Sequence, residues 1–280
     1  MAIPLVLPHA PPCSMLEVDF AELSDPGLVR EINEDSVGQV IPPNPHQART
    51  HGWLFVLADG VGGHDRGEVA SQVAVKTLTE GFRKAPASES HNALLPRLIH
   101  AANCEVFQTA LSSSPGGSSM ASTVVACALR FDRAIISHVG DSRCYLIRHK
   151  YAVPLTRDHT VSSEQFRMGL LTAREAASAH TSNLLTRSLG SNMFVNVETI
   201  EHQLHPGDTL LLCSDGLHHS VDANDMVEVV AANPAMDEAA HALVSLAKQR
   251  DGSDNISVQL IRVRDVERVG MYRGRHYKIP

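Results

Sequence analysis

The chain has 280 residues, 43% of them hydrophobic and 20% charged, with a formal net charge of −7. This length lies near what one sandwich-type domain reaches with short tails, so a large single core is possible. The acidic balance and the lack of a Lys/Arg-rich run argue against a nucleic-acid partner. No apolar run approaches the ~18–20 residues of a membrane span, so we expect no membrane partner.

The five cysteines are odd in number and widely spaced, which matches neither a disulfide framework nor a zinc site. We interpret them as reduced thiols of a cytoplasmic protein, three of them in expected buried strands (Cys127, Cys144 and Cys213). Residues 1–14 have four prolines and no basic start, so they predict a flexible leader rather than a signal peptide. Residues 266–280 predict a mobile basic tail.

The hydrophobic pattern of residues 15–265 predicts one domain of short strands and amphipathic helices. In chain order it predicts a strand over 16–21, a proline-rich loop over 41–50, a strand over 52–59, helices over 68–82 and 89–111, a linker over 112–119, and strands over 123–129, 134–139 and 144–148. Pro96 predicts a kink or a delayed start in the second helix. A polar, weakly helical insertion follows, and then strands over 195–201 and 209–213, helices over 223–232 and 237–250, and a last strand over 256–263.

Strands and helices in this order are partly segregated and joined by connections of hairpin length. That arrangement favours an α+β fold, with antiparallel sheets and helices packed outside them. The glycine-rich stretch 60–67 lacks the Lys-Ser/Thr pair of a phosphate-binding loop.

Acidic residues recur at the ends of expected buried strands. Asp59 follows the apolar run Leu54–Ala58, Asp215 follows a similar run, and Asp254 opens the last one. An Asp-Gly pair alone is typical of a turn. Several ionised carboxylates at converging strand ends would repel each other unless cations neutralise them, so the pattern indicates a divalent-metal site.

The candidate ligands are all hard oxygen donors: Glu34, Asp59, Asp141, Asp215 and Asp254. Such a set selects Mg²⁺ or Mn²⁺. Two such ions ~3.5–4 Å apart would activate a bridging water for in-line displacement at phosphorus. Arg30, four residues before Glu34, could bind the phosphate oxygens. In isolation, residues 30–36 also fit a charged hairpin edge, and residues 140–143 a hairpin turn.

Seven short segments of the sequence, taken together and in order, resemble the motifs of a known family. They are Arg-Glu-Ile-Asn-Glu-Asp (30–35), Asp-Gly-Val-Gly-Gly-His (59–64), Gly-Asp-Ser-Arg (140–143), Leu-Thr-Arg-Asp-His (155–159), Leu-Thr-Arg-Ser-Leu-Gly (185–190), Cys-Ser-Asp-Gly-Leu (213–217) and Asp-Asn-Ile-Ser-Val (254–258). In order, this series resembles the motifs of the PPM family, the metal-dependent type 2C protein Ser/Thr phosphatases, and is closest to the bacterial branch.

The resemblance implies a sandwich of two antiparallel β-sheets flanked by helices, with a binuclear metal centre at one end. By this resemblance Asp59 would bridge two metals, Asp215 and Asp254 would complete the first, and Glu34 with the Gly60 carbonyl would hold the second.

Further roles also come from the resemblance alone. Asp35 would support the ligands, Asp141 would join Asp215 at a third, weaker metal position, and Arg30 would bind the phosphoryl group. Residues 159–192 would form the family's variable flap.

The implied activity is hydrolysis of phosphoserine and phosphothreonine in proteins by direct attack of the water that bridges the two Mn²⁺ or Mg²⁺ ions. A cognate cytosolic Ser/Thr kinase and a monomeric state are expected. Val61 stands where eukaryotic relatives often carry a histidine as proposed general acid, so His64 becomes a candidate for that role, with a structural role as the alternative. With 16 histidines in the chain, we interpret the pair His218-His219 as coincidence.

Two other functions remain open at this point. A catalytically weak phosphoprotein-binding module on the same fold would be expected to have lost metal ligands, and none is lost here. A phosphoesterase acting on small molecules is the second alternative, although no element that would recognise a nucleotide or sugar is evident.

Overall fold

The computed structural model describes residues 15–61, 66–113, 120–272 and 275–278. Its core is two antiparallel sheets. One holds β1 (Glu17–Asp25), β11 (Ile256–Asp265), β10 (Thr209–Cys213), β7 (Arg143–Arg148) and β8 (Tyr151–Pro154), in that spatial order. The other is ordered β2 (Asp35–Val40), β3 (Trp53–Val61), β5 (Val124–Arg130), β6 (Arg133–Val139) and β9 (Glu198–Gln203), with the short β4 (Ala121–Ser122) paired to β3.

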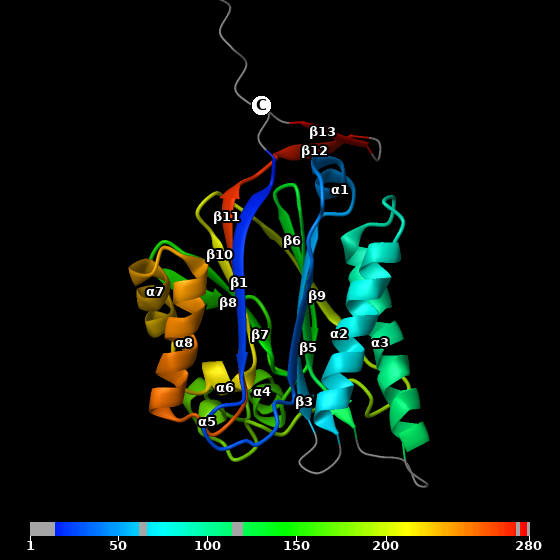
Figure 1. The fold of residues 1–280 in the computed structure, drawn as a ribbon. Coiled ribbons are helices and arrows are strands. Elements are labelled where there is room, and N and C mark those ends of the chain that lie inside the picture. The colour runs from blue at the N-terminus through cyan, green and yellow to red at the C-terminus, as the bar shows by residue number, and fades with distance from the viewer. Residues whose placement is uncertain (1–14, 62–65, 114–119, 273–274, 279–280) are drawn as a thin grey trace, which may run out of the picture.

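Helices cover the outer face of each sheet, so the molecule has four layers (Figure 1). The long helices α2 (Gly67–Lys84) and α3 (His91–Ser113) pack on the β3 sheet. On the other side, α7 (Ala223–Ala232) and α8 (Met236–Arg250) pack on the β10 sheet. The predicted α+β sandwich of two antiparallel sheets flanked by helices is confirmed.

Strand β3 explains why its sequence is a continuous apolar run rather than an alternating one. Leu54, Val56 and Ala58 pack against α2 and α3, whereas Phe55 and Leu57 pack between the two sheets. Both faces of the strand are therefore buried, and each face requires apolar side chains.

The structure differs from the sequence prediction in the segment 41–50. It holds a short helix, α1 (Pro45–Thr50), instead of a loop. Asn44 caps this helix by accepting a hydrogen bond from the Gln47 N–H, and Pro45 takes the first helical position, where no N–H is needed. The three prolines were therefore misleading, because one of them starts a helix.

Helix α3 begins at His91, ahead of Pro96, so of the two alternatives for Pro96 the delayed start is excluded. The basic tail contains a paired hairpin of β12 (Val269–Tyr272) and β13 (Arg275–Lys278). Its mobility and the division into leader, domain and tail stay predictions.

The connection from β6 to β7 is also not a hairpin. β6 belongs to one sheet and β7 to the other, so Gly140, Asp141 and Ser142 carry the chain across the sandwich. The hairpin interpretation of residues 140–143 is wrong for this reason. After β8 the chain forms the small helices α4 (Val161–Arg167) and α5 (Ala173–Ala177), and after β10 the single turn α6 (Asp215–His218).

Within the described parts of the chain, no helix combines the length and the apolar character needed to cross a membrane.

Candidate active site

The first two acids come from neighbouring strands of one sheet. Asp59, near the end of β3, is paired in register with Asp35 at the start of β2. Directly paired residues share a face of the sheet, and the alternation that places Phe55 and Leu57 inward directs Asp59 between the sheets. Thr123 fixes the Asp59 backbone: its hydroxyl accepts from the Asp59 N–H at 3.1 Å, and its N–H donates to the Asp59 carbonyl at 2.8 Å.

The other sheet supplies two more acids at the same end of the sandwich, where α6 lies in Figure 1. Asp215 follows β10 as the first residue of α6, and Asp254 directly precedes Asn255 and β11. Asp141 lies in the segment that crosses between the sheets. All three act electrostatically on the Asp59 carboxyl, so the fold brings together four acids that are far apart in sequence.

Burial and mutual repulsion favour the neutral form of the Asp59, Asp141 and Asp215 carboxyls. The pKa of Asp59 is raised well above its ordinary value, first by burial and then by the neighbouring acids Asp35 and Asp215. Burial, followed by Asp215, raises the pKa of Asp141 to about 8. The pKa of Asp215 is raised as well, by burial and by Asp254. A divalent cation would relieve this repulsion, and the donors are the oxygens that Mg²⁺ and Mn²⁺ prefer.

One carboxylate oxygen of Asp35 needs a hydrogen-bond donor that the described residues do not supply. Its side chain is buried, and Oδ2 accepts a hydrogen bond from the Ser214 hydroxyl at 2.8 Å. Oδ1 is buried and finds no partner among the described residues. Burial raises the pKa of Asp35 to about 7, and the nearby hydroxyls of Ser257 and Ser214 act in the opposite direction. A water held by a metal is one donor that would satisfy Oδ1, as the supporting role predicted for Asp35 requires.

Glu34 lies beside Gly60 and Gly67, where an added side chain would collide with it. A Cβ at Gly67 would lie 2.6 Å from Glu34 Oε1, and a Cβ at Gly60 would lie 2.7 Å from the Glu34 carbonyl oxygen. The Gly60 N–H donates to that carbonyl at 3.1 Å. The Gly60 backbone and Glu34 are therefore adjacent, as a shared ion would require, and the residues present fit the predicted metal group.

Arg30 lies next to this cluster with its guanidinium still accessible. Its Nη2 donates to Asp254 Oδ2 at 3.0 Å, and the two side chains are 43% and 37% exposed. A half-exposed guanidinium beside the acids can meet a phosphoryl group that arrives from solvent. His64, the candidate general acid, lies outside the described residues.

Two histidines contact the acidic residues, although the sequence analysis interpreted this pair as a coincidence. His218 Nε2 donates to the Asp141 carbonyl at 3.0 Å, and burial lowers the pKa of His218 to about 3, so the ring is neutral. His219 Nδ1 lies 3.7 Å from Asp215 Oδ2. Their position one residue beyond the Asp-Gly pair 215–216 was the only signal in the sequence.

A second group, His138, His159 and Glu198, has ligand atoms within 4.8 Å of one another. The Gly140 N–H donates to His159 Nδ1 at 3.1 Å, and His159 Nε2 lies 3.3 Å from Glu198 Oε2 and 3.2 Å from Arg187 Nη1. The Arg187 guanidinium would repel a cation bound at this nitrogen. Arg157 also pairs with Glu198 at 2.8 Å. These residues therefore form a hydrogen-bonded support for the Gly140–Asp141 segment, not a metal site.

Asn103 is a further residue that the sequence interpretation missed. It is buried on α3, where its Oδ1 accepts from the Gly190 N–H at 2.9 Å and its Nδ2 donates to the carbonyls of Asn192 and Met193 at 3.0 Å each. It anchors the end of the segment 159–192 to the domain. A polar residue on the apolar face of an expected helix, between Ile99 and Val106, was the available signal.

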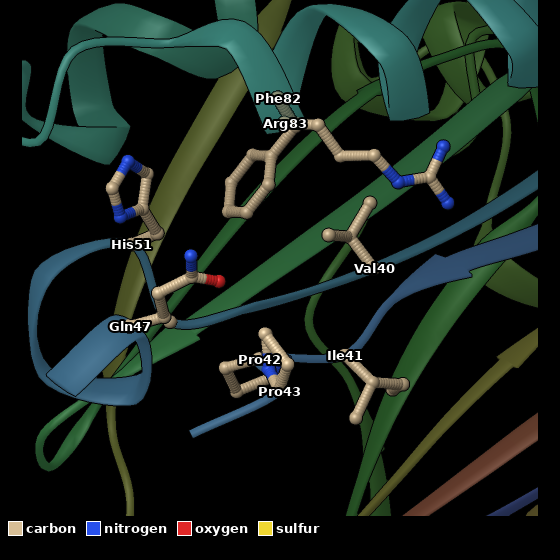
Figure 2. A pocket seen from close by; sticks show the side chains of 9 residues that line it. Val40, Ile41, Pro42, Pro43, Gln47, His51, Phe82 and Arg83 are labelled. Atoms are coloured by element: carbon tan, nitrogen blue, oxygen red, sulfur yellow. The ribbon is translucent and has the colours of Figure 1, made fainter. Parts of the chain in front are cut away.

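A pocket of about 390 Å³ lies elsewhere, between α1 and the C-terminal end of α2 (Figure 2). Figure 2 shows Phe82, Val40, Pro42 and Pro43 around it. None of the residues that line it is acidic, so it does not correspond to the predicted metal centre.

Comparison with known proteins agrees with the fold. The family model described as protein phosphatase 2C matches residues 31–255. The serine/threonine phosphatase Stp of Listeria monocytogenes is 33% identical over 250 residues, which cover 88% of this chain and 96% of that protein. The phosphatase PstP of Mycobacterium tuberculosis is 33% identical over 252 residues, covering 90% of this chain and 46% of PstP.

A solved catalytic domain of a serine/threonine phosphatase PstP, in complex with two manganese ions, superposes with a TM-score of 0.76 at 32% identity, covering 90% of this chain and all of that one. The chain therefore belongs to the protein phosphatase 2C family, in its bacterial branch, and is an enzyme of the protein-serine/threonine phosphatase class.

Proposed function

We propose that this enzyme removes phosphate from phosphoserine and phosphothreonine in proteins, using two Mn²⁺ or Mg²⁺ ions and, at a third and weaker position, Asp141. The convergence of Asp59, Asp141, Asp215 and Asp254 on one end of the sandwich supports this proposal, because the raised pKa values of Asp59, Asp141 and Asp215 mark mutually repelling carboxyls that cations would neutralise. Glu34 and the Gly60 carbonyl complete the set. When bound, the ions supply an activated water for direct attack and neutralise the phosphoryl oxygens.

The residues of the chain have separate tasks in this proposal. Asp59, Asp215 and Asp254 would hold one ion, and Asp59 with Glu34 and the Gly60 carbonyl would hold the other. Asp35, anchored by Ser214, orients these groups from behind. Arg30 binds the phosphoryl oxygens and holds the phosphorus in line for attack. His64 is proposed to protonate the leaving oxygen.

The context of the reaction is also a proposal. Relatives named as serine/threonine phosphatases support phosphoproteins as substrates. We infer a cytoplasmic monomer that reverses the action of a Ser/Thr protein kinase. A small-molecule phosphoesterase and a catalytically weak binding module are the alternatives that the experiment must separate.

The test is phosphate release from a phosphothreonine peptide with Mn²⁺, with EDTA, and by Asp59→Asn in Mn²⁺. We expect manganese-dependent turnover that is lost in both controls, and Mn²⁺ binding by calorimetry that weakens in the variant. Folded wild-type protein that binds Mn²⁺ but releases no phosphate would favour the binding module. Faster hydrolysis of nucleotides than of the peptide would favour the small-molecule enzyme.

A further inference from the structure

The loop between β1 and β2 exposes three apolar side chains that are close in sequence to the proposed phosphate-binding arginine. Leu28, Val29 and Ile32 are 65%, 69% and 59% exposed, and all three lie within two positions of Arg30. Single exposed apolar residues are ordinary on a protein surface. Three exposed apolar residues within two positions of one proposed active-site residue need an explanation of their own. We call these three residues the apolar rim.

The rim is held rigidly from below. Asn255 is buried, and its Nδ2 donates to the carbonyls of Pro26 and Ile32 at 3.1 Å each. Its Oδ1 accepts the Glu34 N–H at 2.8 Å. One buried side chain therefore fixes the backbone of the loop at three points.

Further contacts fix the start of the loop. The Leu28 N–H donates to the Gly252 carbonyl at 2.7 Å, and Asp25 accepts from Lys248 Nζ at 3.0 Å and from the Gly27 N–H at 2.8 Å. The Leu28 side chain lies directly over Gly252, where an added Cβ would come within 2.9 Å of it. A loop fixed in this way loses little conformational entropy when something binds to it.

The proposed function defines what passes over the rim. A phosphorylated side chain whose phosphate contacts Arg30 brings its neighbours in the substrate close to Leu28, Val29 and Ile32, because adjacent residues of an extended peptide are only ~3.3 Å apart along the chain. Apolar side chains next to the phosphoresidue would bury surface on the rim, whereas polar ones would gain nothing from it.

From these contacts we infer that Leu28, Val29 and Ile32 form a subsite that selects phosphopeptides with an apolar residue within about two positions of the phosphoserine or phosphothreonine. This inference rests on the proposed function and adds a substrate preference to it. The occupant is an aliphatic or aromatic substrate side chain, which the rim holds after Arg30 has engaged the phosphate.

The experiment compares phosphothreonine peptides that differ only in one residue, Leu or Ser, at each position from −2 to +2. Turnover of p-nitrophenyl phosphate, which has no flanking residues, is the reference to which kcat/KM values are scaled. For the wild-type enzyme we expect the best Leu peptide to exceed its Ser partner by about 5- to 10-fold, mainly through KM, as expected for one partly buried aliphatic group.

The variants Val29→Ser and Ile32→Ser should reduce this Leu/Ser ratio toward one. Val153→Ser is the matched control, since Val153 is also exposed, at 52%, and lies on β8, at the opposite edge of the sheet from β1. It should keep the wild-type ratio.

Several results would overturn the inference. Equal kcat/KM values for Leu and Ser peptides at every position would do so, as would an unchanged ratio in both rim variants. A change of oligomeric state in the rim variants, with the ratio unchanged, would assign the rim to contact between copies of the chain. Failure to hydrolyse any peptide would instead remove the proposed function, and the inference with it.

Discussion

His159 and Gly140 exchange two hydrogen bonds: the Gly140 N–H donates to His159 Nδ1 at 3.1 Å, and the His159 N–H donates to the Gly140 carbonyl at 3.0 Å. Gly140 directly precedes Asp141 and has φ of 106°, a conformation open to glycine. His159 lies at the start of the proposed flap. The contact therefore ties the flap to the backbone that presents Asp141.

We predict that His159→Ala lowers the free energy of unfolding by about 2 kcal/mol, because a buried N–H loses its acceptor. It should also raise the Mn²⁺ concentration for half-maximal activity several-fold, since Asp141 is no longer held. His159→Asn keeps an acceptor near the Nδ1 position and should restore the Mn²⁺ midpoint. A loss of stability with an unchanged Mn²⁺ midpoint would reduce His159 to a purely structural residue.

The acidic cluster should destabilise the metal-free protein at neutral pH. The pKa is raised to about 7 in Asp35, to about 8 in Asp141, and well above the ordinary value in Asp59. These carboxyls therefore stay protonated in the folded protein at pH values where they ionise in the unfolded chain. The contribution of these protonated carboxyls to the free energy of unfolding is complete below the unfolded pKa of about 4, and it is lost as the pH rises toward 8.

Asp59→Asn removes one member of this cluster. In EDTA at pH 7.5 we expect the variant to be more stable than the wild type by about 1–3 kcal/mol, with a flatter dependence on pH. Mn²⁺ should raise the melting temperature of the wild type and not of the variant. Thermal unfolding between pH 5 and pH 8 is the measurement, and a less stable variant in EDTA would contradict the prediction.

Arg30 should act on phosphate and not on folding. Its ion pair with Asp254 is largely exposed, so Arg30→Ala should change the free energy of unfolding by less than about 1 kcal/mol. The same variant should lower kcat/KM for a phosphopeptide by about 10- to 100-fold and weaken inhibition by inorganic phosphate. Arg30→Lys keeps the charge without the bidentate geometry, so its kcat/KM should lie between those of the wild type and Arg30→Ala. Wild-type phosphate inhibition in both variants would exclude the role.

His91 provides a pH-dependent contribution to stability that is remote from the acids. The ring is buried, its Nε2 lies 2.8 Å from the His51 carbonyl, and burial lowers the pKa of His91 to about 4. The unfolded chain binds a proton near pH 6.5, so the contribution is complete above that pH and is lost as the pH falls toward 4, by about 1.4 kcal/mol per unit.

His91→Gln can still donate to the His51 carbonyl but does not titrate. The free energies of unfolding of the wild type and the variant should be measured in urea at pH 7.5, 6 and 5. Their difference should change in favour of the variant as the pH falls. A constant difference across the three pH values would show that His91 is not the titrating group.

The sequence was sufficient for the elements that carry strong periodicity and for the ordered motifs. Helices α2, α3, α7 and α8 and the eight predicted strands lie within a few residues of their predicted bounds, because each has a face that must be buried. Strands β2, β4 and β8 were not predicted. The acids could be grouped from the sequence because each adjoins an apolar run that predicts a buried strand, whereas the end of the sandwich that each one occupies depends on the antiparallel topology.

The parts that could not be predicted depend on contacts between distant segments. The pattern around Asp141 fits a hairpin locally, and only the pairing of β6 with β9 and of β7 with β10 shows that the chain crosses between sheets. The roles of Asn103 and His218 likewise depend on carbonyl groups 89 and 77 residues away in the sequence. No local pattern specifies such partners.

The crossing segment also means that neither sheet holds a full set of candidate ligands. Glu34 and Asp59 belong to one sheet, Asp215 and Asp254 to the other, and Asp141 connects them. Bound ions would therefore join the two halves of the core as a cross-link does, and their release would let this end of the sandwich part. We expect metal supply to govern how long the protein survives proteolysis as well as how fast it works, so that its abundance in the cell follows the available divalent cation.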